Sequence, residues 1–128
     1  MLPDNLRYAK SHEWVSLAGD VATVGITAFA VEQLTDVIYI QLPDVGKAVT
    51  TAHSFGEIES VKAVSDLYAP VDGDIIEVNK KLTVDPTLVS KSPYGDGWMI
   101  KIKVKPGTTL DHLLTPEQYQ KQIELEAH

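Results

Sequence analysis

Short apolar runs separated by turn-forming residues occupy most of the chain. They are rich in Val, Ile and Tyr, and Gly, Pro, Asp and Asn stand between them. Runs of this length and composition are typical of β-strands. The predicted strands are Trp14–Leu17, Val21–Ile26, Val37–Leu42, Glu57–Val61, Ile75–Val78 and Trp98–Val104. Their close spacing predicts a mainly β fold, a small antiparallel sandwich or barrel.

Two stretches have a helical pattern instead. Thr27 is placed to cap a short helix over residues 28–34. Near the end, Thr115-Pro116-Glu117 offers a cap, a proline at the first helical position and an early acid. We therefore predict a surface helix over Glu117–Glu126, within a C-terminal helical segment of about residues 108–126. The rest, about residues 7–105, forms the core of a single domain that spans 1–128.

A weak internal repeat relates two parts of the chain. Asp36-Val37-Ile38-Tyr39-Ile40 followed by Gly56-Glu57-Ile58-Glu59 is similar to Asp74-Ile75-Ile76-Glu77-Val78 followed by Gly97-Trp98-Met99-Ile100. The first members lie 74 − 36 = 38 residues apart and the second 97 − 56 = 41 residues apart. A difference of three residues fits a loop insertion. The repeat predicts two quasi-symmetric half-units.

Composition excludes several classes of function. The 11 Lys and Arg against 18 Asp and Glu give a net charge of −7, which disfavours a nucleic-acid-binding surface. The lack of cysteine excludes disulfides, thiolate zinc sites and a cysteine nucleophile. No run approaches the roughly 18 apolar residues of a membrane span. The four histidines fit no metal-ligand spacing, so no metal site is expected.

The most informative segment runs from Glu57 to Asp66. It places Lys62 between the small apolar residues Val61 and Ala63, with carboxylates three and five positions before it and four after it. An ordinary salt-bridged lysine on a strand or a helix would explain this pattern. A lysine displayed at a turn for modification would also explain it, because these neighbours leave its ammonium group approachable. No Asn-Gly or Asp-Gly pair marks a tight hairpin here, so residue types alone leave both interpretations open.

Motifs along nearly the whole chain favour the second interpretation. The string Glu59-Ser-Val-Lys-Ala63, followed by Asp66-Leu-Tyr-Ala-Pro-Val71 and Gly73, resembles the lipoyl-attachment hairpin of the glycine cleavage system H protein family. Other segments match that family in order over about residues 7–125: Ser11-His-Glu-Trp-Val15, Gly25-Ile-Thr27, Leu42-Pro43 with Val45-Gly46, and Pro93-Tyr-Gly-Asp-Gly-Trp-Met-Ile-Lys101. Two sites depart from the family pattern. Thr35 stands where the family usually has Gly, and Ala52-His53 stand where Gly and an acidic or polar residue are common. Thr35 predicts either a turn without a positive φ or a small strain.

The resemblance implies a barrel-sandwich hybrid fold and a non-catalytic carrier with lipoic acid amide-linked to Lys62. Such a carrier receives an aminomethyl group from the pyridoxal-phosphate-dependent glycine decarboxylase and delivers it to the tetrahydrofolate-dependent aminomethyltransferase. The FAD-dependent dihydrolipoamide dehydrogenase then reoxidises the dithiol of the arm. Before this cycle can begin, a lipoate-attaching enzyme must attach the lipoyl group to the carrier. A monomer is expected, in a bacterial cytoplasm or, for a mature organellar form, in the mitochondrial matrix.

The resemblance also nominates a resting place for the loaded arm. In H proteins the arm folds into a surface cleft near the Ser-His-Glu-Trp segment, which here points to Ser11, Glu13 and Asp66 as cofactor-binding residues. The alternative is that Glu13 and Asp66 are simply solvated. Glu57 and Glu59 would share one face of a strand, where they could guide partner recognition or form a plain solvated edge.

Other functions fit the sequence less well. A biotinyl carrier usually has methionine beside its lysine, and lipoyl domains of 2-oxoacid dehydrogenases commonly place Asp before it, whereas Val61 and Ala63 stand here. Those domains also lack the N-terminal motif and the C-terminal helix. A relay protein that donates lipoyl groups to other enzymes would keep Lys62. An autonomous enzyme has no nucleophile and base pair to support it.

Overall fold

The computed structural model describes residues 2–126, which form short strands and four helices. The strands are β1 (Arg7–Tyr8), β2 (Glu13–Ala18), β3 (Val21–Ile26), β4 (Val37–Gln41), β5 (Ala48–Val49), β6 (Ser54–Ser60), β7 (Val64–Tyr68), β8 (Gly73–Val78) and β9 (Ile100–Lys103). The helices are α1 (Ala28–Leu34), α2 (Lys81–Val84), α3 (Leu88–Lys91) and α4 (Pro116–Glu126).

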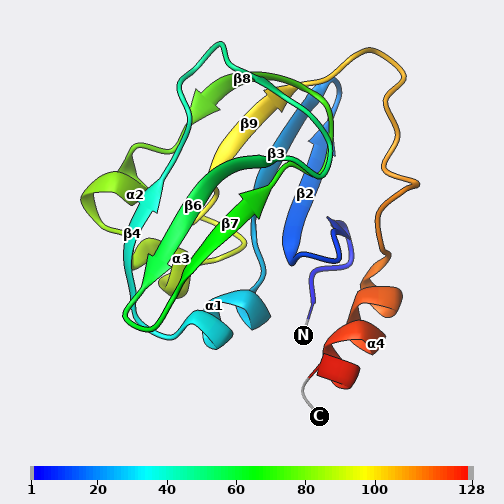
Figure 1. The fold of residues 1–128 in the computed structure, drawn as a ribbon. Helices are drawn as coiled ribbons and strands as arrows, with labels where there is room; N and C mark the ends of the chain where they lie inside the picture. Colours follow the sequence, from blue (N-terminus) through cyan, green and yellow to red (C-terminus); the bar gives the residue numbers. More distant parts are fainter. Residues whose placement is uncertain (1, 127–128) are drawn as a thin grey trace.

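Two antiparallel sheets form an open sandwich, as the sequence predicts. One sheet has the strand order β1-β2-β3-β9-β8-β5 and the other the order β4-β6-β7. In Figure 1 the β6–β7 hairpin crosses in front of the larger sheet, with α1 beside its lower end, while α4 lies next to the N-terminal segment. Side chains that alternate along the strands, such as Val24, Ile40, Ile58 and Ile102, are fully or almost fully buried. Their burial holds the two layers together by the hydrophobic effect.

A second, smaller apolar cluster attaches the C-terminal helix. Tyr119 of α4 is fully buried and stacks on Tyr8, with 4.7 Å between ring centroids and 7° between ring planes. Leu6 and Trp14 complete this cluster. At the start of the helix, Thr115 and Gln118 each accept a hydrogen bond from the other's backbone N–H, which is a capping box. The packing and the cap together fix α4 on the body of the protein.

The internal repeat corresponds to two equivalent strand pairs. β4 pairs with β6, and β8 pairs with β9, all antiparallel. Each pair has a register shift at the same place in the repeat, between Val37 and Tyr39 in one and between Ile75 and Glu77 in the other. A β-bulge leaves one extra residue unpaired. The repeat therefore extends to a structural irregularity that the sequence similarity did not predict.

Several predicted boundaries need correction. Helix α4 begins only at Pro116, so residues 108–115 are not helical, and β9 begins at Ile100 rather than at Trp98. The helix considered for residues 57–66 is wrong, because this stretch forms the ends of β6 and β7 and the turn between them. The pattern also missed β1, β5, β7, α2 and α3. All of these except β7 have only two to four residues, too few to show a hydrophobic period. The five-residue strand β7 was implied only by the resemblance to a lipoyl-attachment hairpin.

The two departures from the family pattern lie at strained positions. Thr35 has φ 66° and Ala52 has φ 69°, both in the region that favours glycine. A turn at Thr35 without a positive φ, one of the two predicted possibilities, is therefore wrong, and the alternative of local strain is the one observed. Thr35 also ends α1, where its N–H donates to the Val31 carbonyl.

Candidate functional site

Lys62 lies at the exposed tip of the β6–β7 hairpin. The last ladder pair is Glu59 with Val64, and the N–H of Ser60 donates to the Ala63 carbonyl at 2.8 Å, so Val61 and Lys62 are the two central residues of a tight turn. Val61 is 69% exposed and Val64 60% exposed, and Lys62 itself is exposed. Nothing among the described residues encloses the ammonium group. The side chain can therefore accept a bulky acyl group without displacing its neighbours.

Ser60 and Asp36 hold the turn from below. The Ser60 hydroxyl bonds both backbone groups of Ala63, accepting from its N–H and donating to its carbonyl at 3.2 Å each. The N–H of Val61 donates at 3.0 Å to the carbonyl of Asp36, the residue before β4. Serine is favoured at the first position of such turns because its hydroxyl can bond nearby backbone groups. A hydrogen-bonded turn thus presents an exposed lysine side chain.

A cavity of about 310 Å³ opens beside the hairpin. It lies between the start of β2, helix α1, the strands β6 and β7 and the last turn of α4. Apolar side chains line part of it, among them Phe29, Leu34, Ile58 and Leu67. Its volume is at the lower end of the range for small-molecule sites. The cavity brings together all three residues nominated for the arm cleft, Ser11, Glu13 and Asp66.

Glu13 is the chemically unusual member of this group. Its side chain is almost completely buried, and burial raises its pKa to about 7, against the lowering effect of its hydrogen bonds. The Ser11 hydroxyl donates to Glu13 Oε1, and the Tyr68 N–H donates to Oε2 at 3.0 Å. Glu13 is therefore not simply solvated, and near neutral pH both of its protonation states are populated. Asp66, in contrast, is exposed at the cavity margin.

Helix α1 supplies an apolar wall because of where it begins. Thr27 caps it by accepting a hydrogen bond from the Ala30 N–H at 3.2 Å, as the sequence predicts. This fixes the direction of the helix so that Phe29, Ala30 and Leu34 line the cavity. Apolar groups on one side and a buried carboxyl on the other suit a ligand with a hydrocarbon body and a cationic end.

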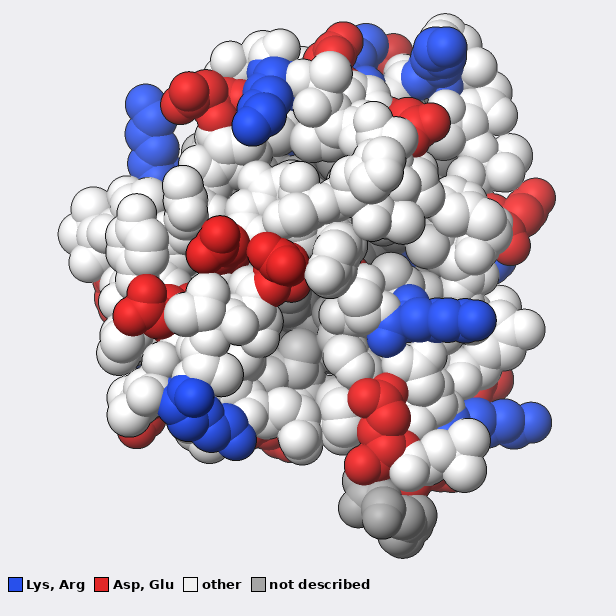
Figure 2. All heavy atoms as spheres, in the orientation of Figure 1, with Lys and Arg blue, Asp and Glu red and all other residues white. Residues whose placement is uncertain are grey.

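Acidic side chains gather on the outer face of the hairpin. Glu57 stands directly opposite Asp66 across the β6–β7 ladder, and Glu59 lies two residues farther along β6. On the face shown in Figure 2, acidic groups lie over the hairpin and beside the end of α4, with a hollowed region between them. Like charges placed opposite each other lower the stability of a strand pair. This arrangement therefore calls for a role outside folding.

Sequence reasoning missed several cavity residues. His12 stands between Ser11 and Glu13, and its ring nitrogens lie 2.7 Å from the Tyr119 hydroxyl and 3.1 Å from Glu126 Oε1. Glu126 also lines the cavity. His12 lies 107 positions from Tyr119 and 114 positions from Glu126 in the sequence. No local sequence pattern carries a signal over such separations. The segment Ser11-His12-Glu13 was the only available clue.

Comparisons with known proteins agree with this geometry. A model of the family "Glycine cleavage H-protein" matches residues 6–126. The chain is 52% identical over 126 residues to the glycine cleavage system H protein of Gloeothece citriformis, covering 98% of this chain and 96% of that protein. The chain belongs to the glycine cleavage H-protein family.

Other members of the family extend this result. The mitochondrial H protein of Flaveria trinervia is 53% identical over 123 residues, covering 96% of this chain and 74% of that protein. The crystal structure of an H protein from Mycobacterium marinum superimposes with a TM-score of 0.88 at 39% identity, covering 96% of this chain and 99% of the other. The predicted family and fold are thereby confirmed. Within residues 2–126, no helix is long and apolar enough to span a membrane.

Proposed function

We propose that this chain is a lipoyl carrier of the glycine cleavage system and that Lys62 is the attachment site. The supporting observation is an exposed lysine at the tip of a rigid hairpin, beside a cavity with a buried carboxyl, in a member of the H-protein family. When bound, the lipoyl group would supply a disulfide whose S–S bond breaks as one sulfur takes up the aminomethyl group and the other becomes a thiol, and the arm would be left as a dithiol once that group is passed on. The chemistry belongs to the partner enzymes, so this chain presents and protects the arm.

The lipoyl-lysine arm is long enough to reach the cavity. From the lysine Cα to the dithiolane ring there are about eleven bonds, which span about 13 Å when extended at the pitch of a peptide chain. Asp66, at the cavity margin, lies four residues from Lys62, so their Cα atoms are at most about 14 Å apart. An arm anchored at the turn therefore reaches the cavity without any movement of the backbone.

The cavity could protect the aminomethyl group of the loaded arm from water. Water converts a free aminomethyl thioether into a thiol, formaldehyde and ammonia, so the cargo needs a place that excludes water. The ionised form of Glu13 would bind the terminal ammonium, and the Ser11 hydroxyl and Asp66 lie on the same cavity. A bound cation in turn lowers the pKa of a neighbouring carboxyl. Entry of the ammonium thus favours the charged state of Glu13 that binds it.

The carrier would visit its partners in sequence. It would take the aminomethyl group from the decarboxylase, deliver it to the aminomethyltransferase and present the dithiol to dihydrolipoamide dehydrogenase. A lipoate-attaching enzyme would have to reach Lys62 first, which the exposure of the turn permits. Tethering keeps the reactive group at a high effective concentration near each docked active site.

Two experiments test this function. Intact-mass measurement of protein expressed with lipoate and its ligase is expected to show the lipoyl mass, and Lys62→Ala is expected to abolish it. A Lys62→Ala protein that still gains this mass would refute the attachment site. Reconstitution with the three enzymes then distinguishes glycine cleavage from a lipoyl relay, in which the modified chain would donate its lipoyl group to another enzyme.

The cavity role has its own test. Lipoylated protein loaded with the aminomethyl group is expected to release ammonia faster when Glu13 is replaced by Ala. The matched control is Glu32→Ala, which removes a carboxylate from the exposed face of α1. An equal release rate in Glu13→Ala and wild type would remove Glu13 from this role.

A further inference from the structure

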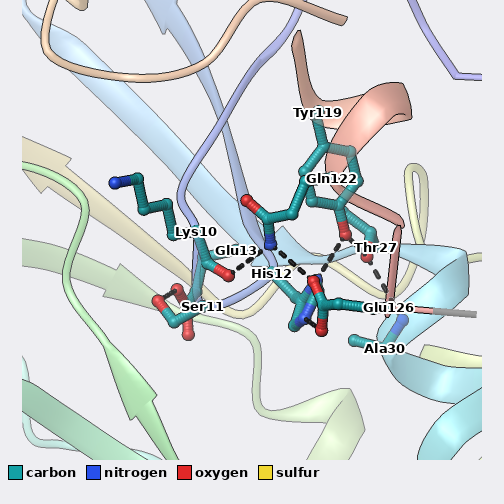
Figure 3. Close-up of polar contacts among 9 residues, drawn as sticks. All are labelled: Lys10, Ser11, His12, Glu13, Thr27, Ala30, Tyr119, Gln122 and Glu126. Carbon is teal, nitrogen blue, oxygen red and sulfur yellow. Dashed lines mark hydrogen bonds and ion pairs between the residues drawn. The ribbon is translucent and has the colours of Figure 1, made fainter. Parts of the chain in front are cut away.

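One buried hydroxyl contacts both walls of the cavity. The Tyr119 hydroxyl of α4 lies 2.7 Å from His12 Nδ1 and 2.7 Å from Thr27 Oγ1 (Figure 3). His12 stands between Ser11 and Glu13 on the polar wall. Thr27 caps α1, which forms the apolar wall. The C-terminal helix thus connects two segments that are both needed to shape the cavity.

For a neutral His12 ring, the hydrogen-bond partners define how the protons are arranged. Nε2 faces the Glu126 carboxylate, which can only accept, so Nε2 carries a hydrogen. In a neutral ring Nδ1 is then an acceptor, and the Tyr119 hydroxyl donates to it. Tyr119 in turn accepts from the Thr27 hydroxyl, whose oxygen also accepts from the Ala30 N–H. Every donor and acceptor in this chain of bonds is satisfied, and each bond polarises the next.

The same contacts hold a strained part of the backbone. His12 has φ 80°, a conformation that costs free energy for a residue other than glycine. Its ring is held at both nitrogens by α4, and Gln122 of the same helix donates to the Lys10 carbonyl at 2.8 Å (Figure 3). Because Ser11 and Glu13 flank His12, the conformation of His12 determines where their oxygens lie.

We propose that α4 keeps the two walls of the arm cavity aligned, with the Tyr119 hydroxyl as the positioning group. In this proposal Glu126 is an anion at the cavity margin that attracts the cationic end of the arm. This inference rests on the proposed function, because it gives that cavity its purpose. Tyr119 touches no cargo and acts through His12 and Thr27. Glu126 belongs to the cavity wall itself.

The charges around the cavity agree with this division of roles. Glu13 is only 1% exposed, so its wall is closed to water, and this burial raises the pKa of its carboxyl. A hydrogen bond from Gln122, and next the nearby His12, lower the pKa of Glu126, so this carboxyl stays ionised at neutral pH. The other titratable groups on the cavity are His12 and Asp66. Glu126 therefore contributes a constant negative charge, whereas that of Glu13 depends on the ligand.

The first test uses the protein without a lipoyl group. Tyr119→Phe removes only the hydroxyl, and Tyr8→Phe is the matched control, because Tyr8 belongs to the same stacked pair but donates to the Pro3 carbonyl instead. In Tyr119→Phe we expect the NMR resonance of His12 Nδ1 to move toward that of an unbonded nitrogen. We also expect the pKa of Glu13 to fall toward its ordinary value as water enters. If both signals match those of Tyr8→Phe, the positioning role of Tyr119 is wrong.

The second test uses the lipoylated, aminomethyl-loaded protein. Tyr119→Phe is expected to release ammonia about fivefold faster, the effect of losing one hydrogen bond, while Tyr8→Phe keeps the wild-type rate. Lipoylation of Lys62 should be equally fast in both. Unchanged release in Glu13→Ala would remove Glu13 from its proposed role, and the measurements on the protein without a lipoyl group would still decide whether Tyr119 shapes the cavity.

Glu126, at the other end of this chain of hydrogen bonds, is exposed, so its substitution does not threaten folding. Glu126→Gln removes the negative charge at the cavity margin. The control Glu124→Gln removes an equal charge from the same helix, where Glu124 accepts from Gln120 and does not line the cavity. We expect faster ammonia release, with a weaker dependence on salt, only in Glu126→Gln. Equal behaviour of the two variants would overturn the role of Glu126.

Discussion

At the scale of single residues, the fold gives two neighbouring carboxyl groups different tasks. Glu13 is buried, bonded to Ser11 and Tyr68, and titrates near neutral pH. Asp66 lies on the same cavity but is exposed. A buried carboxyl binds a cation more tightly than an exposed one, because less water competes, and it also costs more when no cation is present. The empty cavity should therefore carry a measurable penalty in stability.

The pH dependence of folding measures this penalty. Burial raises the pKa of Glu13 from 4.5 to about 7, so the folded state favours the protonated form. The stabilising effect of that proton is complete below about pH 4.5 and is lost as the pH rises to about 7. The loss is roughly 3 kcal/mol. Glu13→Gln imitates the protonated form, so its free energy of unfolding should lack this decrease.

Urea denaturation of both proteins at pH 5 and at pH 8 provides the measurement. The difference between the two proteins at the two pH values cancels the contributions of all other titrating groups. Wild type should lose more stability than Glu13→Gln on going to pH 8. An identical change in the two proteins would show that Glu13 is not desolvated in the folded state.

At the scale of elements, the β6–β7 hairpin shows how local chemistry displays the lysine. Among the described residues other than glycine, only His12, Thr35 and Ala52 have positive φ, so Val61 and Lys62 form a turn without the conformation that Asn-Gly turns require. The Ser60 hydroxyl, bonded to both backbone groups of Ala63, supplies the missing support. The position of Lys62 thus depends on a buried serine.

Replacing Ser60 by Ala should loosen the turn. The Ala63 N–H and carbonyl lose their side-chain partner, which should lower the free energy of unfolding by about 1 kcal/mol. Amide exchange at Ala63 should accelerate, and lipoylation of Lys62 should slow, because the attaching enzyme meets a less ordered turn. Ser65→Ala, on the neighbouring strand, removes the same atoms away from the turn. Equal exchange rates at Ala63 in the two variants would contradict this role of Ser60.

Features that depend on contacts between nearby residues could be predicted from the sequence, whereas features that depend on distant residues could not. Most strands and both capped helices were predictable, because Thr27 and Thr115 signal helix starts locally and alternating apolar residues show a period. The strand β7 and the shortest elements, β1, β5, α2 and α3, were not predictable from the pattern. The placement of Ser11, Glu13 and Asp66 followed from family resemblance, whereas Tyr119 and Glu126 reach the site only through tertiary packing. Their role could be found only in three dimensions.

At the scale of the whole molecule, charge is distributed unevenly around the arm. The chain carries a net charge of −7, and Glu57, Glu59 and Asp66 stand on the hairpin that presents Lys62. Within residues 2–126, the ion pairs of lysine join Lys91 to Asp85, Lys101 to Glu77 and Lys103 to Asp20, and none involves the hairpin acids. These acids are therefore available to partners.

The acidic hairpin should speed the approach of partners with basic surfaces. Complementary charges raise the association rate more than the affinity, and salt screens them over about 10 Å at 0.1 M. We expect the rate of Lys62 lipoylation under limiting enzyme to fall as salt is raised. Glu57→Gln should lower the rate severalfold at low salt and reduce its dependence on salt. The same substitution relieves the repulsion with Asp66 and should raise the stability of the hairpin slightly.

Glu117→Gln makes the comparison decisive, because it changes the net charge equally on an exposed part of α4 and away from the hairpin and the cavity. If overall charge alone directed the encounter, both variants would slow equally. If the hairpin face directs it, only Glu57→Gln slows, and the two rates converge at high salt, where the charges are screened. A lipoylation rate that does not change with salt in any of these proteins would leave the hairpin acids without a part in recognition.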